Sequence, residues 1–331
     1  MRGFLRTHQT QEQEMEKQST AVVFPGQGSQ CFGMGKEFFD HFPESRAAFQ
    51  EASEALMWDT AAMCFSQNPS LNLTEFAQPL ILTTEIAMFR GLCVHYGLTP
   101  SCYGGHSLGE YAALVAAGVM PLGIAAQLVS LRGKLMQTAC PQGTGGMAAV
   151  IARNIGMEEI QAALADLPLD VANVNYSGQI VISGLLRAFG EAEKRLGGLL
   201  DNRGDWRFVP LNVSAPFHSR FMAPVCAPFG EALEDAKINW DTAKARNVTS
   251  NVTGLFHEPD SQRITDALTL QVSRPVLWKN NMEALIKKAT QVVEIGPARP
   301  LSGFFRSIGI DARAVTSLAT ARRAFENREA A

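Results

Sequence analysis

The sequence predicts an α/β fold with a mostly parallel sheet covered by helices, into which a small second sheet is inserted. Short apolar runs alternate with helical patterns along the first part of the chain, which is typical of a parallel sheet. Between residues 143 and 211 the expected elements follow the order β-α-β-β-α-β, the ferredoxin-like split arrangement. We therefore expect a large subdomain over residues 21–142 and 212–320, and a small ferredoxin-like subdomain over residues 143–211.

The first elements of the large subdomain follow from local patterns. Ala21–Phe24 is an apolar run that predicts a buried strand, and Pro25–Gln30 is a glycine-containing loop. The loop lacks the Gly-Lys-Ser/Thr ending of a P-loop and the spacing of a dinucleotide fingerprint. Helical patterns follow at Pro43–Leu56 and Thr83–Tyr96, and Leu98–Gly104 is expected to form a short buried strand.

The next segment, Tyr111–Leu131, is apolar enough to resemble a membrane span. Gly118, Pro121 and Gly123 interrupt it, however, so two buried helices with a turn near Pro121 are expected instead.

The remaining elements belong to the small subdomain and to the return of the large one. In the small subdomain we expect strands at Met147–Ile151, Leu169–Val174, Gln179–Ser183 and Arg207–Leu211, and helices at Met157–Leu164 and Ala188–Leu199. Strand patterns resume at Asn247–Thr249 and Gln291–Ile295. The second of these ends in a Gly-Pro loop at an edge of the sheet where ligands commonly bind.

Composition and termini narrow the class of protein. The 331 residues are 46% hydrophobic and 18% charged, as in a globular protein with a large core, and the net charge of -3 argues against a general nucleic-acid binder. Six scattered cysteines without a Cys-x-x-Cys pair argue against a zinc site and a disulfide framework, and indicate a reducing cytoplasm. Residues 1–20 include a polar run and lack the apolar core of a secretory signal, so a disordered extension is expected there. Residues 321–331 are expected to form a C-terminal tail.

The pentapeptide Gly105-His106-Ser107-Leu108-Gly109 fits Gly-x-Ser-x-Gly, the nucleophile elbow. Such a turn joins a strand to a helix and exposes the serine hydroxyl, while its glycines allow close packing. A strand is expected before it and a helix of small residues, Glu110–Ala117, after it. A glycine-rich packing turn with an incidental serine is the alternative, but the context favours a catalytic Ser107.

A serine hydroxyl is a weak nucleophile at neutral pH, so Ser107 needs a base within hydrogen-bond distance. Of the six histidines, His218 is expected on a loop beside the cleft between the two subdomains. His106 adjoins the serine, but neighbouring side chains at a tight turn usually diverge, and His257 lies in a polar segment. We therefore predict that His218 is the base. No acidic residue has an evident position to orient its ring, which a backbone carbonyl could do instead.

The negatively charged intermediate of acyl transfer needs two N–H donors. Leu108, which follows the nucleophile, is expected to supply one through its main chain. The main-chain N–H of Gln27, in the glycine loop, is expected to supply the other.

Four segments resemble, in order and spacing, the signatures of malonyl-CoA:acyl-carrier-protein transacylases. These are Phe24–Gln30, Gly105–Glu110, Arg132–Gln137 and Glu294–Pro297. The similarity runs from about Ala21 to about Ser317, and Asn173–Asn175, Gln179–Gly184 and Gln271–Trp278 also resemble family segments. The resemblance implies an α/β-hydrolase-like body with a ferredoxin-like insert, which agrees with the fold expected from the periodicity.

The resemblance also implies a ping-pong acyltransferase that moves a malonyl group from coenzyme A to the phosphopantetheine thiol of an acyl carrier protein. It implies that Ser107 carries the acyl group and that His218 relays the proton, oriented by the main-chain carbonyl of Gln271. It further implies that Arg132 pairs with the malonyl carboxylate and that Gln78 lines the same pocket. A guanidinium suits this task because it binds a carboxylate through two parallel hydrogen bonds and stays charged when desolvated.

Phe217 departs from the pattern of the family's fatty-acid members, which usually have a small residue before the histidine. Phe217-His218-Ser219 resembles polyketide-synthase acyltransferases that select malonyl over methylmalonyl units. A bulky ring fills the space that a methyl branch needs. The resemblance thus favours an enzyme that supplies extender units to a polyketide synthase, with housekeeping fatty-acid synthesis as the alternative.

The expected partners follow from this reaction. Malonyl-CoA is a substrate, the phosphopantetheine belongs to a free-standing or polyketide-synthase carrier protein, and no bound cofactor or metal is expected. We expect a cytoplasmic monomer that binds neither nucleic acid nor membrane. Two other functions remain open. A hydrolase of the same fold would clear acyl groups from carrier proteins without needing Arg132, and a non-catalytic docking protein would not need the nucleophile, base and arginine together.

Overall fold

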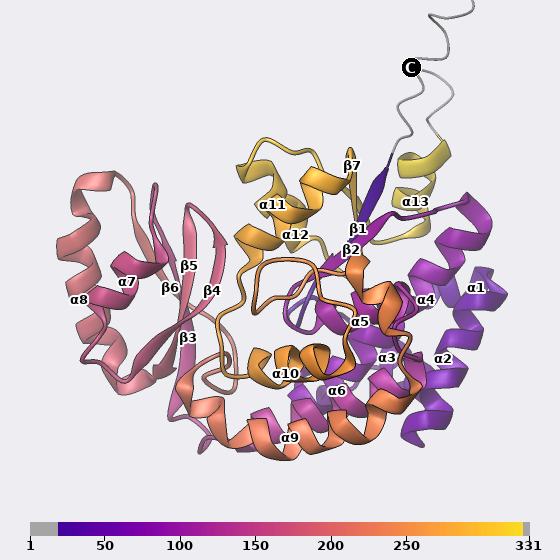
Figure 1. Cartoon of the computed structure of the whole chain (residues 1–331), viewed down its shortest axis with the longest axis horizontal. Coiled ribbons are helices and arrows are strands. Elements are labelled where there is room, and N and C mark those ends of the chain that lie inside the picture. Colours follow the sequence, from indigo (N-terminus) through magenta and orange to yellow (C-terminus); the bar gives the residue numbers. More distant parts are fainter. Residues whose placement is uncertain (1–18, 327–331) are drawn as a thin grey trace, which may run out of the picture.

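Two sheets organise the part of the chain that the computed structural model describes, residues 19–326 (Figure 1). The first is parallel, has the order β2-β1-β7-β8, and consists of β1 (Thr20–Phe24), β2 (Cys102–Gly105), β7 (Gln291–Ile295) and β8 (Arg313–Val315). The second is antiparallel, has the order β4-β5-β3-β6, and consists of β3 (Gly145–Ile151), β4 (Leu169–Tyr176), β5 (Gln179–Leu185) and β6 (Arg207–Pro210). The predicted fold class, an α/β body with a ferredoxin-like insert, is confirmed. The exact boundaries at residues 143 and 211 stay a prediction.

The parallel sheet is covered on both faces, because β1 is apolar at every position after its first residue. Val22 and Phe24 belong to the larger core, whereas Ala21 and Val23 belong to a smaller core on the other side. The larger core includes residues of α2 (Pro43–Leu56), α4 (Thr74–Tyr96), α5 (Gly109–Ala116), α6 (Leu122–Thr138), α9 (Ala223–Ala236), α10 (Ser261–Gln271) and α13 (Leu318–Phe325). The smaller core is formed with α11 (Trp278–Lys288) and α12 (Pro300–Ser307). Two short helices, α1 (Lys36–His41) and α3 (Thr60–Phe65), pack beside α2.

The antiparallel sheet also uses its two faces differently. Ala148 and Val150 of β3 pack in a separate core with α7 (Met157–Ala163) and α8 (Phe189–Leu200), which Figure 1 shows at one end of the molecule. Met147 and Ala149, which point the opposite way, join the larger core of the body. The face of the small sheet that α7 and α8 do not cover therefore packs against the body.

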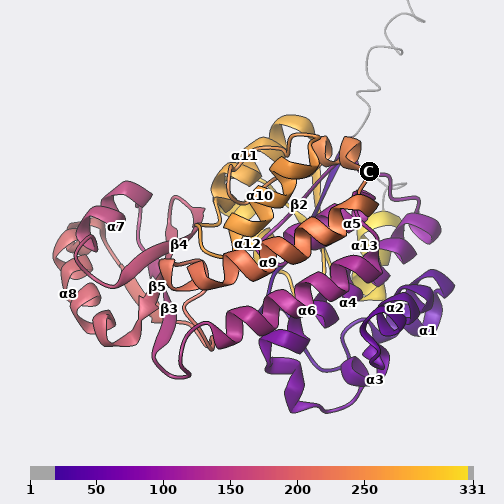
Figure 2. The same cartoon turned by 60° about the horizontal axis from the view of Figure 1, so that its bottom comes forward.

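The apolar stretch after the elbow forms two helices, α5 and α6, as predicted. Gly118 between them has a φ of 78°, and Pro121 directly precedes α6. Helix α6 packs against both α4 and α9 (Figure 2). Within residues 19–326, no helix combines the length and the apolar composition that crossing a bilayer requires.

Some boundaries differ from those expected. Helix α4 begins at Thr74 rather than at Thr83 and includes Pro79 in its second turn. The helix continues through the proline, whose missing N–H removes only one hydrogen bond. The strand expected at Asn247–Thr249 is wrong: Val248 and Thr249 form only isolated bridges, to Tyr103 and to Phe256.

The ends of the described chain also differ. Helix α13 continues to Phe325 with Ala321 and Ala324 buried, so the tail expected from residue 321 is wrong for that helix. Residues 327–331 lie outside the described residues. The same holds for residues 1–18 of the expected disordered extension, and Thr20 already belongs to β1.

Candidate active site

The elbow joins β2 to α5 through a turn that only glycine permits at two positions. A Cβ on Gly105 would lie 1.9 Å from the Gly109 carbonyl oxygen, and one on Gly109 would lie 2.2 Å from that of Phe24. Ser107, at the tip, has a left-handed backbone with a φ of 54°. Its N–H donates to Asn251 Oδ1 at 2.6 Å, which holds the strained turn in place. The geometry is that of a nucleophile elbow.

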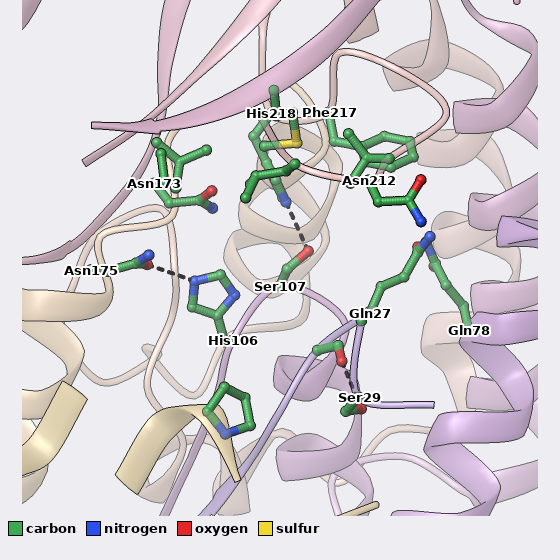
Figure 3. A pocket seen from close by; sticks show the side chains of 18 of the residues that line it. Gln27, Ser29, Gln78, His106, Ser107, Asn173, Asn175, Asn212, Phe217 and His218 are labelled. Carbon is green, nitrogen blue, oxygen red and sulfur yellow. Dashed lines mark hydrogen bonds between the residues drawn. The ribbon is translucent and has the colours of Figure 1, made fainter. Parts of the chain in front are cut away.

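Ser107 and His218 are within hydrogen-bond distance, although 111 positions separate them in the chain. Ser107 Oγ lies 2.7 Å from His218 Nε2, a contact drawn in Figure 3. His218 Nδ1 lies 2.7 Å from the main-chain oxygen of Gln271. A proton on Nδ1 would donate to that carbonyl and leave Nε2 free to accept from the serine hydroxyl. Burial, helped by the charge of Arg132, lowers the pKa of His218 to about 3. The imidazole is therefore neutral at pH 7 and available as a base.

Arg132, in the middle of α6, is buried with 1% of its surface exposed. Its Nη2 donates to Ser107 Oγ at 3.1 Å and to Gln271 Oε1 at 2.9 Å, while Nη1 donates to Gln78 Oε1 at 2.9 Å. The guanidinium also lies 5.6 Å from the centre of the Tyr111 ring. Burial lowers the pKa of this guanidinium from its ordinary value. No carboxylate contacts Arg132 within the described residues, so a buried cation faces the serine without a direct ionic partner.

The glycine loop after β1 lies against the elbow. A Cβ on Gly26 would lie 2.5 Å from the His106 carbonyl oxygen, so only glycine allows this approach. Ser29 Oγ donates to the Gly26 carbonyl at 2.8 Å and steadies the loop. Within residues 19–326, the main-chain N–H groups of Gln27 and Leu108 make no hydrogen bond. Neither group is thus occupied by a hydrogen bond to another described residue, and their binding of an oxyanion stays a prediction.

These groups open onto one cavity of about 670 Å³. The body contributes the loop after β1, the elbow, Arg132 and His218, and the antiparallel sheet contributes Met147, Ala149, Asn173, Asn175, Gln179 and Val181. Phe217 and Gln78 line the same cavity. Leu108 is completely buried and does not line the cavity, so its main-chain role stays a prediction. Within the described residues, no three His, Cys, Asp or Glu side chains gather as a metal site would need.

His106 was set aside in the sequence analysis because neighbouring side chains at a turn usually diverge, yet it lines this cavity. Its Nε2 lies 3.0 Å from Asn175 Oδ1 of β4, as Figure 3 shows. Asn175 Nδ2 in turn donates to Gln179 Oε1 at 2.7 Å. His106 therefore links the elbow to the antiparallel sheet. His106 and Ser107 thus both line the one cavity.

The sequence analysis also did not predict a buried polar cluster behind the elbow. Glu110 Oε1 lies 2.8 Å from His257 Nε2, and both side chains are almost completely buried. Glu110 Oε2 accepts from Asn251 N at 3.0 Å and from Gln271 Nε2 at 2.7 Å. The sequence does contain a signal for this cluster, because an acidic residue in the first turn of so apolar a helix as α5 needs buried partners.

Comparison with known proteins agrees with this site. The family described as "Acyl transferase domain" matches residues 21–297. A malonyl CoA-acyl carrier protein transacylase of Escherichia coli O157:H7 is 39% identical over 294 residues, which cover 87% of this chain and 92% of the relative.

Solved structures agree as well. A malonyl CoA-acyl carrier protein transacylase from Clostridium perfringens superposes with a TM-score of 0.83 at 36% identity, covering 94% of this chain and 97% of that one. A malonyl-transacylase in complex with a type II PKS acyl-carrier protein superposes with a TM-score of 0.82 at 35% identity, covering 94% of this chain and 100% of that one. This chain belongs to the malonyl CoA-acyl carrier protein transacylases, a family of acyl transferase domains.

Proposed function

We propose that this protein transfers the malonyl group of malonyl-CoA to the phosphopantetheine thiol of an acyl carrier protein, with Ser107 as the transient carrier. One observation supports this best. The Ser107 hydroxyl oxygen lies within hydrogen-bond distance of both a neutral imidazole, that of His218, and a buried guanidinium, that of Arg132. The nucleophilic oxygen thus contacts both a base and a cation that could bind a free carboxylate.

In the first half-reaction Ser107 Oγ attacks the thioester carbonyl carbon, and its proton moves to His218 Nε2. The Gln271 carbonyl stabilises the resulting imidazolium through Nδ1–H. The N–H groups of Gln27 and Leu108 bind the oxyanion. When the C–S bond breaks, His218 returns the proton to the departing sulfur, which releases coenzyme A and leaves malonyl on Ser107.

The second half-reaction reverses these steps with a different thiol. The phosphopantetheine thiol of the carrier protein gives its proton to His218 and attacks the ester carbonyl. The C–O bond to Ser107 breaks, and Oγ recovers the proton. Ordered exchange of one thiol for another is the ping-pong scheme.

Arg132 favours this reaction over the hydrolase alternative. Among the described residues, the Arg132 guanidinium donates hydrogen bonds only to neutral oxygens. The free carboxylate of a malonyl group would add an ion pair to this cation, which Gln78 and Gln271 hold in place. A hydrolase that clears acetyl groups has no anion to place there, and a buried arginine would be a needless cost. Gln78 holds Nη1 at 2.9 Å and so keeps the guanidinium plane toward the serine.

The pathway and location form a finer part of the proposal. Phe217, 7% exposed at the cavity wall, would exclude a methyl branch on the acyl group, which supports a polyketide extender role over housekeeping fatty-acid synthesis. The similarity to a malonyl-transacylase solved with a type II PKS carrier protein is consistent with this role. All six cysteines are free thiols, which supports a cytoplasmic location. We propose that the enzyme acts as a monomer.

Labelling tests the proposed function directly. Incubation with malonyl-CoA labelled in the acyl group should place label on Ser107, and addition of a carrier protein with its phosphopantetheine should remove it to that protein. Ser107→Ala should take up no label. Label retained by Ser107→Ala, or release of labelled free acid without transfer, would contradict the proposal.

A further inference from the structure

Glu110 touches neither the cavity nor Ser107 Oγ, yet it contacts Asn251 and Gln271. Asn251 holds the elbow at Ser107, and Gln271 contacts both Arg132 and His218. Glu110 is the second residue of α5 and has 1% of its surface exposed. Its Oε2 accepts from Gln271 Nε2 at 2.7 Å and from Asn251 N at 3.0 Å, and its Oε1 lies 2.8 Å from His257 Nε2. The Asn251 N–H and the Gln271 amide NH₂ can only donate, so Glu110 Oε2 is the acceptor in both of these contacts.

This acceptor decides which way the Gln271 amide points. The Gln271 NH₂ group donates both to Glu110 and to the Ser107 carbonyl, the latter at 3.0 Å. Its Oε1 consequently faces Arg132 Nη2, at 2.9 Å. A flipped amide would place its oxygen against the Glu110 carboxylate and its donors against the guanidinium, so both contacts would become repulsive.

The Arg132 guanidinium is therefore held between two amide oxygens, that of Gln271 on Nη2 and that of Gln78 on Nη1. Arg132 Nε has no hydrogen-bond partner within the described residues. Its orientation depends on these two amides, on Ser107 Oγ and on the Tyr111 ring. Loss of one amide oxygen leaves the plane of the cation free to turn away from the place where a carboxylate would bind.

We propose that Glu110 is a positioning residue for the recognition of acyl groups that carry a carboxylate. It acts through Gln271, whose side chain fixes Arg132 while its main-chain carbonyl fixes His218. The inference rests on the proposed function, because it gives Arg132 the malonyl carboxylate to bind. Glu110 thus affects the preference for malonyl over an uncharged acyl group and does not take part in the chemistry of acyl transfer.

Two nearly isosteric variants test this relay from its two ends. Glu110→Met removes the acceptor, and Gln271→Met removes the side-chain amide while leaving the main-chain carbonyl that His218 uses. The measured quantity is the ratio of single-turnover acylation rates of Ser107 with malonyl-CoA and with acetyl-CoA. Each variant should lower this ratio by about tenfold or more, the effect of an unpaired buried hydrogen-bonding group. Glu110→Gln keeps an oxygen for Gln271 and can donate to an unprotonated His257 Nε2, so its ratio should stay within about threefold of wild type.

A matched control uses another buried carboxyl group. Glu85 of α4 is completely buried, and neither of its oxygens has a hydrogen-bond partner within the described residues. Glu85→Gln should leave the ratio unchanged. If thermal unfolding shows that Glu110→Met does not fold, Gln271→Met still tests the link from Gln271 to Arg132. A Glu110→Gln ratio more than about threefold below that of wild type would then overturn the relay, because this variant keeps the acceptor for Gln271.

Arg132→Ala, measured in parallel, separates this inference from the proposed function. An unchanged ratio in Arg132→Ala would overturn the carboxylate-binding role of Arg132 itself. A lowered ratio there, with wild-type ratios in Glu110→Met and Gln271→Met, would overturn only the role of Glu110. Equal losses of the malonyl and acetyl rates in those two variants would also overturn it, since that is the result of a structural role. The double variant Glu110→Met/Arg132→Ala should have the ratio of Arg132→Ala alone, because the relay ends at the guanidinium.

Discussion

Ser107 and His218 share a 2.7 Å hydrogen bond, and both have a left-handed backbone, with φ of 54° and 57°. This conformation costs a residue with a Cβ about 1–2 kcal/mol. Each strained backbone is held by a hydrogen bond from its own N–H, to Asn251 Oδ1 for Ser107 and to the Val272 carbonyl for His218. The surrounding fold therefore maintains strain at both members of the pair, as is common where side chains must be aimed at each other.

Relief of that strain should be measurable at Ser107. Ser107→Ala and Ser107→Gly both remove the hydroxyl, but only glycine adopts a positive φ without a Cβ clash. We expect the free energy of unfolding of Ser107→Gly to exceed that of Ser107→Ala by up to about 1 kcal/mol. Urea denaturation of the two inactive variants measures this, and a less stable glycine variant would show that the backbone at the elbow is not strained.

The acid limb of the reaction should lie far below the ordinary pKa of histidine. Burial and Arg132 lower the pKa of His218 to about 3, so the base stays neutral as the pH falls through 6.5. We expect kcat/KM for acylation by malonyl-CoA, which reports on the free enzyme, to stay level from pH 8 down to about pH 5. Circular dichroism at each pH is the control. Half-loss of kcat/KM near pH 6.5 with the fold intact would contradict the lowered pKa.

The same shift affects stability in a defined direction. Between pH 6.5 and the lowered pKa the unfolded chain binds a proton at His218 that the folded chain does not. Stability contributed by this group is thus present above pH 6.5 and is lost as the pH falls below it.

Removal of Arg132 should affect the two acyl groups differently. Arg132→Ala leaves the malonyl carboxylate without its partner, at a cost on the order of 2–5 kcal/mol, whereas acetyl loses nothing comparable. Initial rates with malonyl-CoA and acetyl-CoA measure the shift in preference. Arg90→Ala is a suitable control because Arg90 pairs with Glu51 at the surface. Equal losses for both substrates would mean that Arg132 is structural.

Phe217 should limit the size of the acyl group. Phe217→Ala opens space beside His218, and we expect the preference for malonyl-CoA over methylmalonyl-CoA to fall by about 1–3 kcal/mol. The ratio of kcat/KM values is the measurement, because a general loss from the altered core affects both substrates alike. A ratio unchanged from wild type would mean that Phe217 only packs against the core.

Docking of the carrier protein should depend on a local basic patch near the cavity, since the chain as a whole has a net charge of -3. Arg299 and Arg306 are exposed and flank or belong to α12, whose Pro300 and Phe304 line the cavity. Reversing both arginines to Glu should raise the KM for an acidic carrier protein and leave acylation of Ser107 nearly unchanged, because the first half-reaction does not involve the carrier.

A charge-matched control for that patch lies on α13. Arg322 and Arg323 are also exposed, and their reversal to Glu should leave the KM for carrier protein unchanged. Equal effects of the two double reversals would attribute the change to net charge alone. Unaltered carrier kinetics in Arg299→Glu/Arg306→Glu would exclude this patch as the docking surface.

Local sequence patterns were sufficient for the features that depend on near neighbours. The apolar run of β1, the glycines around Ser107 and the order of elements in the small subdomain could all be predicted, because side-chain alternation and turn geometry repeat over a few residues. The pattern around Pro79 misplaced the start of α4 for the same reason, since the packing that tolerates a proline there is not local.

The sequence by itself thus determined the fold class, the elbow and the choice of His218 as the partner for Ser107, while its resemblance to a family implied the roles of Arg132 and Gln271. Only the tertiary structure decided which residues contact and support these side chains. Glu110 and His257, 147 positions apart, form a buried pair, and His106 lines the same cavity as Ser107 and contacts Asn175 of the antiparallel sheet. Such contacts depend on how helices and sheets pack against one another. A carboxyl group needs such partners only when the fold buries it away from water, and the sequence does not show which residues they are.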